Sequence, residues 1–261
     1  SGLGDGVVKL EFPGYGAAHI GGGGDEETSS RDKDVLGMSG AVLAAPVPVF
    51  DAATHTSRLP NGLDVPHVTA VLSAVGVSTN FEDLAQLSPR LEQRILEACA
   101  RGAAVHADCH AYDDDDLAWQ TVDPRVRPYV DAWAECRIAK GLEPLVRERY
   151  LFHPLYLYAG ITDGVFALRR KRILIDLKTG DPDDAAAHLQ TAAYSAAYEA
   201  EHPDEPIAER WAVRLVPGRR VPYRIVNYTA PARRDQHLDL STFLACLTTY
   251  NAQPERRKRV A

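Results

Sequence analysis

The segment RILIDLKTG (Arg172–Gly180) combines the Ile and Leu run of a buried β-strand with an acid and a base two residues apart. Side chains at alternate positions of a strand point to the same face, so Asp176 and Lys178 are predicted to share one face. The opposite face, occupied by Ile and Leu, is predicted to pack in the core. Charged groups beside a core need partners, so the sequence around this strand has to supply them.

The chain alternates between helical and strand-like patterns around this segment. Strands are predicted at 144–153, 158–169 and 171–180, and again at 209–218 and 220–229. Helices are predicted at 65–76, 88–112, 124–141, 181–202 and 238–253. This order predicts an α/β fold with a central mixed β-sheet flanked by helices.

Several helix boundaries carry recognisable end signals. Ser88 is a suitable N-cap and is followed by Pro89, a residue that fits the first helical position. Gly141 is expected to end the third helix. Gly102 lies inside the second helix, where glycine costs about 1 kcal/mol relative to alanine. Its presence there indicates close packing at that position.

The first 64 residues differ from the rest of the chain. They include GYGAAHIGGGGDEETSSRDKD (14–34), which is rich in glycine and charge and has no periodicity. Such composition predicts a flexible or loosely packed N-terminal arm. The glycine run does not precede Gly-Lys-Ser or Gly-Lys-Thr, so it is not a phosphate-binding loop of that type. We therefore divide the chain into an arm or accessory segment, 1–64, and a domain, 65–261.

Composition limits the classes of function. The chain has 261 residues, 45% of them hydrophobic and 25% charged, which is ordinary for a globular protein with a sizeable core. The formal net charge of −7 means that a polyanion must bind through a local basic surface or a metal ion. No run of about 18 apolar residues and no secretory signal occur, so we expect a cytoplasmic protein without membrane contact. The four cysteines form no CxxC pair and are expected to be reduced.

A second acid lies in the preceding predicted strand. Asp163 belongs to GITDGVF (160–166), with twelve residues between it and Asp176. A hairpin of that length brings Asp163 beside Asp176 and Lys178. Carboxylate oxygens suit a hard divalent cation such as Mg²⁺ or Mn²⁺. Such a cation lowers the pKa of water and shields a phosphate, while the lysine orients the attacking water or hydroxide. Taken alone, however, DLK fits a solvent-facing ion pair on a half-exposed strand.

Five motifs occur in order along the chain and favour the metal site. They are GAAVH (102–106), Glu148 in the first predicted strand, GITDGVF (160–166), ILIDLKTG (173–180) and QTAAY (190–194). On these motifs, residues 65 to 250 resemble the PD-(D/E)XK nuclease superfamily, and within it the RecB-like and phage-exonuclease branch. That branch carries G-x-x-x-H, a glutamate, G-x-x-D, D/E-x-K-T-G and Q-x-x-x-Y on successive elements. The resemblance implies a restriction-endonuclease-like core.

The resemblance also implies roles for individual residues. Asp163 and Asp176 are the expected metal carboxylates, and the backbone carbonyl of Leu177 completes the set. His106 is an additional expected metal ligand. Lys178 is expected to position the nucleophilic water and to stabilise the transition state.

Other motif residues receive supporting roles from the resemblance. Glu148 is an expected outer ligand or water-orienting group, although its place between Arg147 and Arg149 also fits a plain solvent ion pair. Gln190 and Tyr194 lie four residues apart on one helical face. There they contact the nucleic-acid backbone or support the lysine, or they form the polar edge of an interior helix.

Two further patterns have competing readings. His106 and His110 are spaced i, i+4, which also fits a zinc pair, but no HExxH glutamate lies between them. The family pattern selects His106, and His110 is then expected at the surface. The segment DDDD (113–116) lacks the glycine and terminal glutamate of a calcium-binding EF-hand loop, so we interpret it as a solvated acidic turn.

Basic residues are the candidate contacts to nucleic acid. Arg170 and Arg172, at the turn between the second and third strands, are the predicted contacts, and Arg219, Arg220 and the tail RRKR (256–259) are further candidates. Some RecB-like relatives hold an iron–sulfur cluster with one cysteine before the nuclease core and three after it. This chain has three before the core strands and only Cys246 after them, which argues against a cluster.

The sequence therefore predicts a metal-dependent deoxyribonuclease, in the first place an exonuclease, that hydrolyses phosphodiester bonds through a metal-activated water. The expected partners are linear ends of duplex or single-stranded DNA, and a second copy of the chain or a recombination protein. The expected setting is DNA recombination or processing by a phage or mobile element, in a bacterial cell or phage-infected host. The alternatives are a restriction-type endonuclease and a non-catalytic nucleic-acid-binding module. The intact Asp163, Asp176 and Lys178 argue against the second alternative.

Overall fold

The computed structural model describes residues 46–51, 56–78, 88–180, 184–231 and 236–253. Its centre is a five-stranded sheet with the order β4-β5-β6-β7-β8. The strands are β4 (Glu143–His153), β5 (Tyr158–Leu168), β6 (Lys171–Lys178), β7 (Ile207–Leu215) and β8 (Tyr223–Asn227). Strands β6 and β7 are parallel and the other neighbours are antiparallel, so the mixed sheet predicted from the sequence is confirmed.

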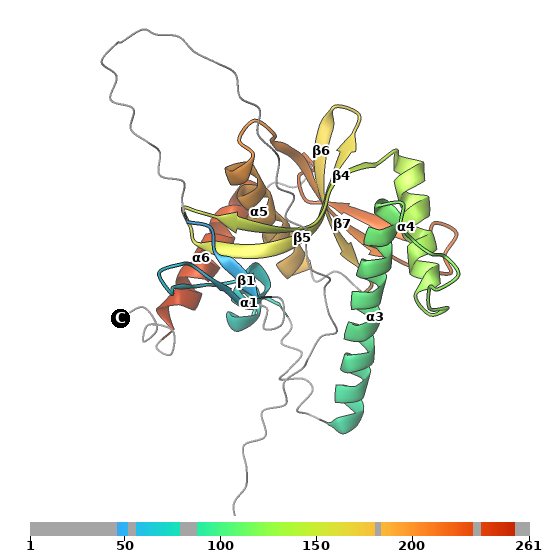
Figure 1. The fold of residues 1–261 in the computed structure, drawn as a ribbon, viewed down its shortest axis with the longest axis horizontal. Helices are drawn as coiled ribbons and strands as arrows, with labels where there is room; N and C mark the ends of the chain where they lie inside the picture. Colours follow the sequence, from blue (N-terminus) through green and yellow to red (C-terminus); the bar gives the residue numbers. More distant parts are fainter. Residues whose placement is uncertain (1–45, 52–55, 79–87, 181–183, 232–235, 254–261) are drawn as a thin grey trace, which may run out of the picture.

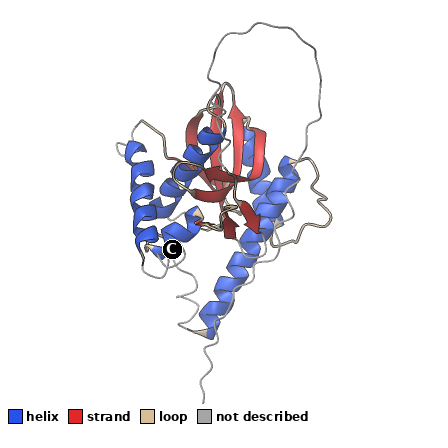
Figure 2. Ribbon diagram, turned by 60° about the vertical axis from the view of Figure 1, so that its left-hand side comes forward, coloured by secondary structure: helices blue, strands red, loops and turns tan. Residues whose placement is uncertain are grey.

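Helices cover both faces of this sheet (Figures 1 and 2). They are α1 (Val68–Ala74), α3 (Pro89–Asp113), α4 (Arg127–Lys140), α5 (Asp184–Glu201) and α6 (Asp239–Ala252), with one 3₁₀ turn, η1 (Gln236–Leu238). One core cluster joins α1, α5 and α6 to the sheet, and a second joins α3 and α4 to the opposite face. Helix α5 links the two parallel strands, which need a long crossover connection.

Strand β6 divides its side chains between these two clusters. Ile173, Ile175 and Leu177 pack in the cluster with α3 and α4, whereas Leu174 packs in the cluster with α5 and α6. The alternation predicted from the sequence is therefore confirmed, and Asp176 and Lys178 occupy the same alternate positions as Leu174. Each fully buried Ile or Leu stabilises the fold by about 1.5–3 kcal/mol, which fixes the register of this strand.

The end signals of the helices agree with the structure. The Ser88 hydroxyl oxygen accepts a hydrogen bond from the Leu91 N–H at 3.2 Å and caps α3. Gly141 follows α4 with φ 64°, a left-handed conformation that glycine adopts without strain. Gly102 faces the end of β6, but a Cβ atom there would lie 3.6 Å from the Thr179 hydroxyl, an ordinary contact. The packing around Gly102 is therefore loose enough to accept the methyl group of an alanine.

The described part of the predicted N-terminal arm is a small antiparallel sheet of β1 (Val49–Asp51), β2 (Thr56–Arg58) and β3 (Asp64–Val65). Its Leu59 and Val65 pack with Phe152 of β4 and Ala159 of β5. The boundary expected between residues 64 and 65 falls inside β3. Residues 46–51 and 56–64 are thus attached to the main sheet through a shared apolar cluster, and residues 1–45 lie outside the described part.

Two further findings bear on the expectations from composition. Among the described helices, none combines the length and apolar character needed to cross a membrane. The four cysteines are free thiols. Cys109 and Cys136 are buried in the cluster of α3 and α4, whereas Cys246 packs against the cluster on the other face of the sheet. The sheet thus separates Cys246 from these two cysteines.

Candidate metal centre

The site begins where β5 and β6 separate. Their pairing runs from Leu168 and Lys171 to Gly164 and Ile175 and stops there, although both strands continue. Asp163, the next residue of β5, lies at this opening.

Beyond this point the Asp163 carboxylate, and not a β5 backbone carbonyl, accepts the hydrogen bond from β6. Its Oδ2 accepts a hydrogen bond of 2.7 Å from the backbone N–H of Leu177 in β6. The N–H and C=O of one strand residue point to the same side, so the Leu177 carbonyl oxygen faces the same opening. The geometry therefore brings together the Asp163 carboxylate and the Leu177 carbonyl, two of the metal ligands expected from the resemblance.

Helix α3 brings His106 to this opening. Its Nδ1 lies 3.0 Å from Asp163 Oδ1, and the two side chains are 21% and 17% exposed. Burial acts to lower the pKa of His106, but the charge and hydrogen bond of Asp163 outweigh it and raise that pKa. Burial acts to raise the pKa of Asp163, but the His106 charge and hydrogen bond hold it well below its usual range. The two groups thus form a charged pair open to solvent on one side.

Asp176 and Lys178 form the other half of the opening. Lys178 Nζ forms an ion pair with Asp176 Oδ2 at 2.7 Å, and this buried oxygen has no other partner among the described residues. Burial raises the pKa of Asp176, and nearby Asp163 adds to the effect despite the opposing charge of Lys178. The two carboxylates raise the pKa of Lys178 against the effect of burial. Lys178 is therefore a cation held between acids.

A chain of polar side chains on α5 extends from the lysine. Lys178 Nζ donates to Gln190 Oε1 at 3.4 Å, and Gln190 Nε2 donates to the Tyr194 hydroxyl at 3.2 Å. Tyr194 is only 3% exposed. A Cβ atom on Gly160 of β5 would lie 2.4 Å from the Tyr194 ring, so the ring occupies the space that glycine leaves. This placement favours support of the lysine over direct contact of Tyr194 with nucleic acid.

His110 is the site residue that the sequence analysis placed wrongly. It is 6% exposed and therefore buried, not at the surface. Its Nδ1 lies 3.1 Å from Glu148 Oε2 of β4. The i, i+4 spacing from His106 was the signal for it, because that spacing puts both rings on one face of α3. The absence of an HExxH glutamate was the wrong criterion, since the acidic partner comes from a strand 38 residues away.

The alternative reading of Glu148 as a solvent ion pair with its neighbours is also wrong. Arg147 pairs with Asp114 at the end of α3, and Arg149 pairs with Glu201 of α5 at 3.3 Å. Each arginine therefore has an acidic partner of its own, and Glu148 contacts His110 instead.

The backbone explains how Glu148 reaches α3. Consecutive strand residues normally point to opposite faces, yet Glu148 contacts His110 of α3 and Arg147 contacts Asp114, the residue that directly follows α3. Glu148 has φ 38°, in the left-handed region that non-glycine residues rarely adopt. The pairing of β4 with β5 passes from Arg147–Gly164 to Arg149–Thr162 around this residue. The local distortion turns the Glu148 side chain toward His110.

Three of these residues can hold a metal ion together. His106, His110 and Asp163 each offer one ligand atom, and these atoms all lie within 4.8 Å of one another. The buried Asp176 oxygen, whose only partner among the described residues is the Lys178 ammonium, and the nearby Asp163 carboxylate fit a divalent cation, whose charge would favour the ionised form of Asp176. The donor set of carboxylates and imidazoles therefore suits a first-row divalent ion.

The interpretation of DDDD as a solvated turn is wrong for its first residue. Asp113 is 4% exposed and accepts hydrogen bonds from Trp133 Nε1 at 3.0 and 3.1 Å. Arg137 donates to it at 2.7 Å. Asp113 thus joins α3 to α4, whereas the three aspartates that follow it are exposed.

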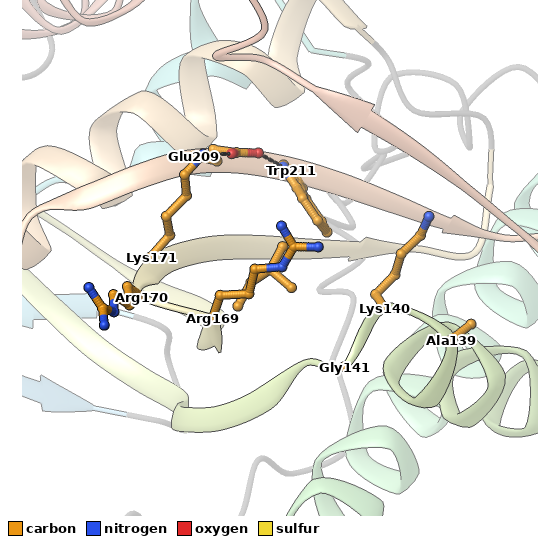
Figure 3. A pocket seen from close by; sticks show the side chains of 9 residues that line it. Ala139, Lys140, Gly141, Arg169, Arg170, Lys171, Glu209 and Trp211 are labelled. Atoms are coloured by element: carbon orange, nitrogen blue, oxygen red, sulfur yellow. Dashed lines mark hydrogen bonds and ion pairs between the residues drawn. The ribbon is translucent and has the colours of Figure 1, made fainter.

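The predicted nucleic-acid contacts Arg170 and Arg172 do not join the acidic cluster. Arg172 pairs with Glu205 at 3.3 Å, and Arg170 lines a hollow at the β5–β6 turn together with Lys140 and Lys171 (Figure 3). This turn is at the opposite end of β6 from Lys178, about 23 Å away at about 3.3 Å per residue. Basic side chains thus flank a second region of the sheet, distant from the acids.

Comparison of this chain with models of known protein families finds no match, and neither does comparison with curated proteins. The resemblance noted in the sequence therefore rests on the motifs themselves. The geometry of these motif residues is the basis of the proposal that follows.

Proposed function

We propose that this protein is a metal-dependent DNA nuclease, in the first place an exonuclease, with a restriction-endonuclease-like core. One observation carries the proposal: the opening between β5 and β6 brings Asp163, Asp176 and Lys178 together from two strands. Asp163 contacts the Leu177 N–H at 2.7 Å, and Lys178 lies 2.7 Å from Asp176. A buried and a partly buried acid with one lysine, open to solvent through Asp163 and His106, are suited to phosphodiester hydrolysis.

Each residue has a task in this reaction. Asp163, Asp176, His106 and the Leu177 carbonyl would hold Mg²⁺ or Mn²⁺, which when bound supplies Lewis-acid stabilisation of the phosphate charge. Lys178 keeps its proton, because the neighbouring carboxylates raise its pKa. Its ammonium group orients the attacking water and offsets negative charge that develops on the phosphate.

The polar chain on α5 restrains the lysine. Gln190 accepts from Lys178 and is itself bonded to the buried Tyr194, so the ammonium group has a fixed direction. Precise placement of such a group contributes to rate because a shift of about 1 Å can cost about 100-fold.

The proposal is tested with linear and covalently closed circular DNA, each incubated with Mg²⁺ or Mn²⁺. Wild type is compared with Asp176→Ala and with Asp116→Ala, which removes an exposed acid of the α3 end as a matched control. Degradation of linear DNA alone, lost in Asp176→Ala and kept in Asp116→Ala, is the expected result.

Other outcomes correct or reject the proposal. Nicking of circles would replace the exonuclease by an endonuclease of restriction type. Metal-independent binding of DNA without any cleavage would favour a non-catalytic binding module. Equal cleavage by wild type and Asp176→Ala would reject the site.

A further inference from the structure

His110 has one ring nitrogen engaged and one without a hydrogen-bond partner. Its Nδ1 contacts Glu148 Oε2 at 3.1 Å. Its Nε2 is buried and has no hydrogen-bond partner in the part of the chain that the structure describes. A buried polar atom of this kind is uncommon in folded proteins and calls for a ligand, a water or a strain-based explanation.

The Glu148 contact determines which nitrogen is available. An ionised carboxylate only accepts hydrogen bonds, so the His110 Nδ1 carries the hydrogen in this pair. In a neutral imidazole the lone pair then resides on Nε2. A carboxylate that accepts from one imidazole nitrogen while the other binds a metal is the usual support of metal-ligating histidines.

The position of His110 agrees with this chemistry. It lies one helical turn after His106 on α3, about 6 Å along the axis, so both rings face the opening. The ligand atoms of His106, His110 and Asp163 lie within 4.8 Å of one another. The two rings are nearly perpendicular, with centroids 6.2 Å apart, so neither ring stacks over the nitrogen atoms of the other.

The backbone conformation of Glu148 directs its carboxylate toward His110. A left-handed φ of 38° at a non-glycine residue is unfavourable, and here it turns the carboxylate onto His110. Arg147 and Arg149 take separate acidic partners, so Glu148 is not required for their charges.

We propose that His110 is a further metal ligand of the site and that Glu148 is its positioning residue. This inference rests on the metal site of the proposed function and deepens it. Of the two histidines, the nuclease motifs assign a ligand role only to His106. Two imidazoles beside Asp163 make a donor set that binds Mn²⁺ and later first-row ions better than Mg²⁺, since Mg²⁺ prefers oxygen ligands. The site is therefore selective for a transition-metal ion.

The direct test counts nitrogen ligands on Mn²⁺ bound to the full chain. Electron spin-echo measurements detect ¹⁴N coupling from each coordinated imidazole. Wild type is expected to show two coordinated nitrogens, and His110→Gln is expected to show one. His237→Gln removes an exposed histidine of η1 and serves as the matched control with two. The wild-type count decides the question even where a variant fails to fold.

Affinities for Mn²⁺ and Mg²⁺, measured by calorimetry, test selectivity and the part played by Glu148. His110→Gln and Glu148→Gln are expected to weaken Mn²⁺ binding by about 10–100-fold while Mg²⁺ binding changes by less than about 3-fold. The ratio of the Mn²⁺ affinity to the Mg²⁺ affinity is measured on one sample of each variant. Partial unfolding lowers both affinities together, so it does not change this ratio.

Two results overturn the inference. One coordinated nitrogen in wild type means that a water or another group occupies Nε2. An unchanged Mn²⁺ affinity in both variants has the same meaning. Failure of the proposed function is distinct, because it appears as absence of DNA cleavage in a protein that still binds Mn²⁺ through two nitrogens.

Discussion

Helix α3 takes part in two groups of buried carboxylates that differ in how their charge is balanced. At its end, Asp113 accepts two contacts from Trp133 and one from Arg137, at 2.7–3.1 Å. In its middle, His106 contacts Asp163, and nearby Asp176 has a buried oxygen whose only partner in the described residues is the Lys178 ammonium.

Under the proposed function, the difference separates a structural acid from a catalytic one. Asp113 has donors for its charge from a neighbouring helix, so it joins α3 to α4 and needs nothing more. Asp163 has the Leu177 N–H and His106 as partners, whereas Asp176 has only the Lys178 ammonium among the described residues. Burial and the nearby Asp163 charge raise the pKa of Asp176 despite the charge of Lys178, so its ionised form is only partly compensated. Burial alone does not distinguish the two groups, because Asp113 and Asp176 are 4% and 3% exposed. The number of hydrogen-bond donors around each carboxylate distinguishes them.

The largest expected effect is on cleavage. Asp163→Ala and Asp176→Ala each remove a carboxylate that would hold the metal, and we expect DNA cleavage to fall by at least about 1000-fold, equivalent to about 4 kcal/mol. Rates on linear DNA with Mn²⁺ measure this. The thermal midpoint of the metal-free protein should change little in Asp176→Ala, because burial and the Asp163 charge disfavour the ionised form of that carboxylate. It should fall in Asp163→Ala, which loses the Leu177 and His106 contacts. A collapse of the fold in Asp176→Ala would erase the contrast with Asp113.

The reverse pattern is expected at Asp113. Asp113→Ala leaves Arg137 and Trp133 without their acceptor, and we expect a loss of about 3 kcal/mol in unfolding free energy, because one member of a buried pair is removed. This corresponds to a fall of about 6–12 °C in melting temperature. Calorimetry measures it, with Asp116→Ala as the exposed control. Mn²⁺ affinity should be unchanged below the transition, and weakened Mn²⁺ binding would show that the two groups are coupled.

A smaller effect is expected from Gly160→Ala, which addresses the polar chain behind the lysine. The new Cβ would lie 2.4 Å from the Tyr194 ring, so the ring must move and the Gln190 contact with it. We expect cleavage to fall by about 10–100-fold through misplacement of Lys178, with Mn²⁺ affinity retained. Parallel rate and binding measurements separate the two. Tyr194→Phe, which removes only the hydroxyl, should give a weaker loss, and loss of Mn²⁺ binding in Gly160→Ala would contradict the supporting role.

These contrasts also show what could be predicted from the sequence. The alternation in β6 gave its two faces correctly, because Ile and Leu at alternate positions are a local signal. The approach of Asp163 to Asp176 followed from hairpin length in the same way. Local patterns thus sufficed for the sheet and for the acids at its opening.

The errors arose where the partner is distant in sequence. Asp113 finds Trp133 and Arg137 at separations of 20 and 24 residues, so the DDDD segment alone resembles a surface turn. His110 finds Glu148 only because the backbone of β4 departs from regular strand geometry at that residue. No periodicity in the sequence signals a single left-handed residue inside a strand.

The metal site should also respond to pH through His106. Its pKa is raised above 6.5 because the effect of Asp163 outweighs that of burial, so the charged pair stabilises the metal-free protein at low pH. That contribution is fully present below about 6.5 and is lost as pH rises through the raised pKa. The proton competes with the metal, so Mn²⁺ affinity should rise by about tenfold per pH unit below that pKa and level off above it.

Calorimetric titrations between about pH 5.5 and 8.5 measure this dependence. His106→Asn removes one of the two imidazole ligands and should make the profile less steep over this range. An affinity that does not vary with pH in wild type would mean that His106 stays outside the metal's ligand set.

The smallest expected effect separates the scaffold of α3 from its two charged groups. Gly102→Ala adds a Cβ at 3.6 Å from the Thr179 hydroxyl, a distance that requires no movement, and replaces a poor helix former with the best one. We expect a gain of up to about 1 kcal/mol in unfolding free energy, or about 2–4 °C in melting temperature. Cleavage and Mn²⁺ affinity should match wild type, because the helix keeps His106 and His110 in place. Lower Mn²⁺ affinity with a higher melting temperature would instead show that the metal site requires α3 to flex at Gly102, and the glycine would then serve the site and not the packing.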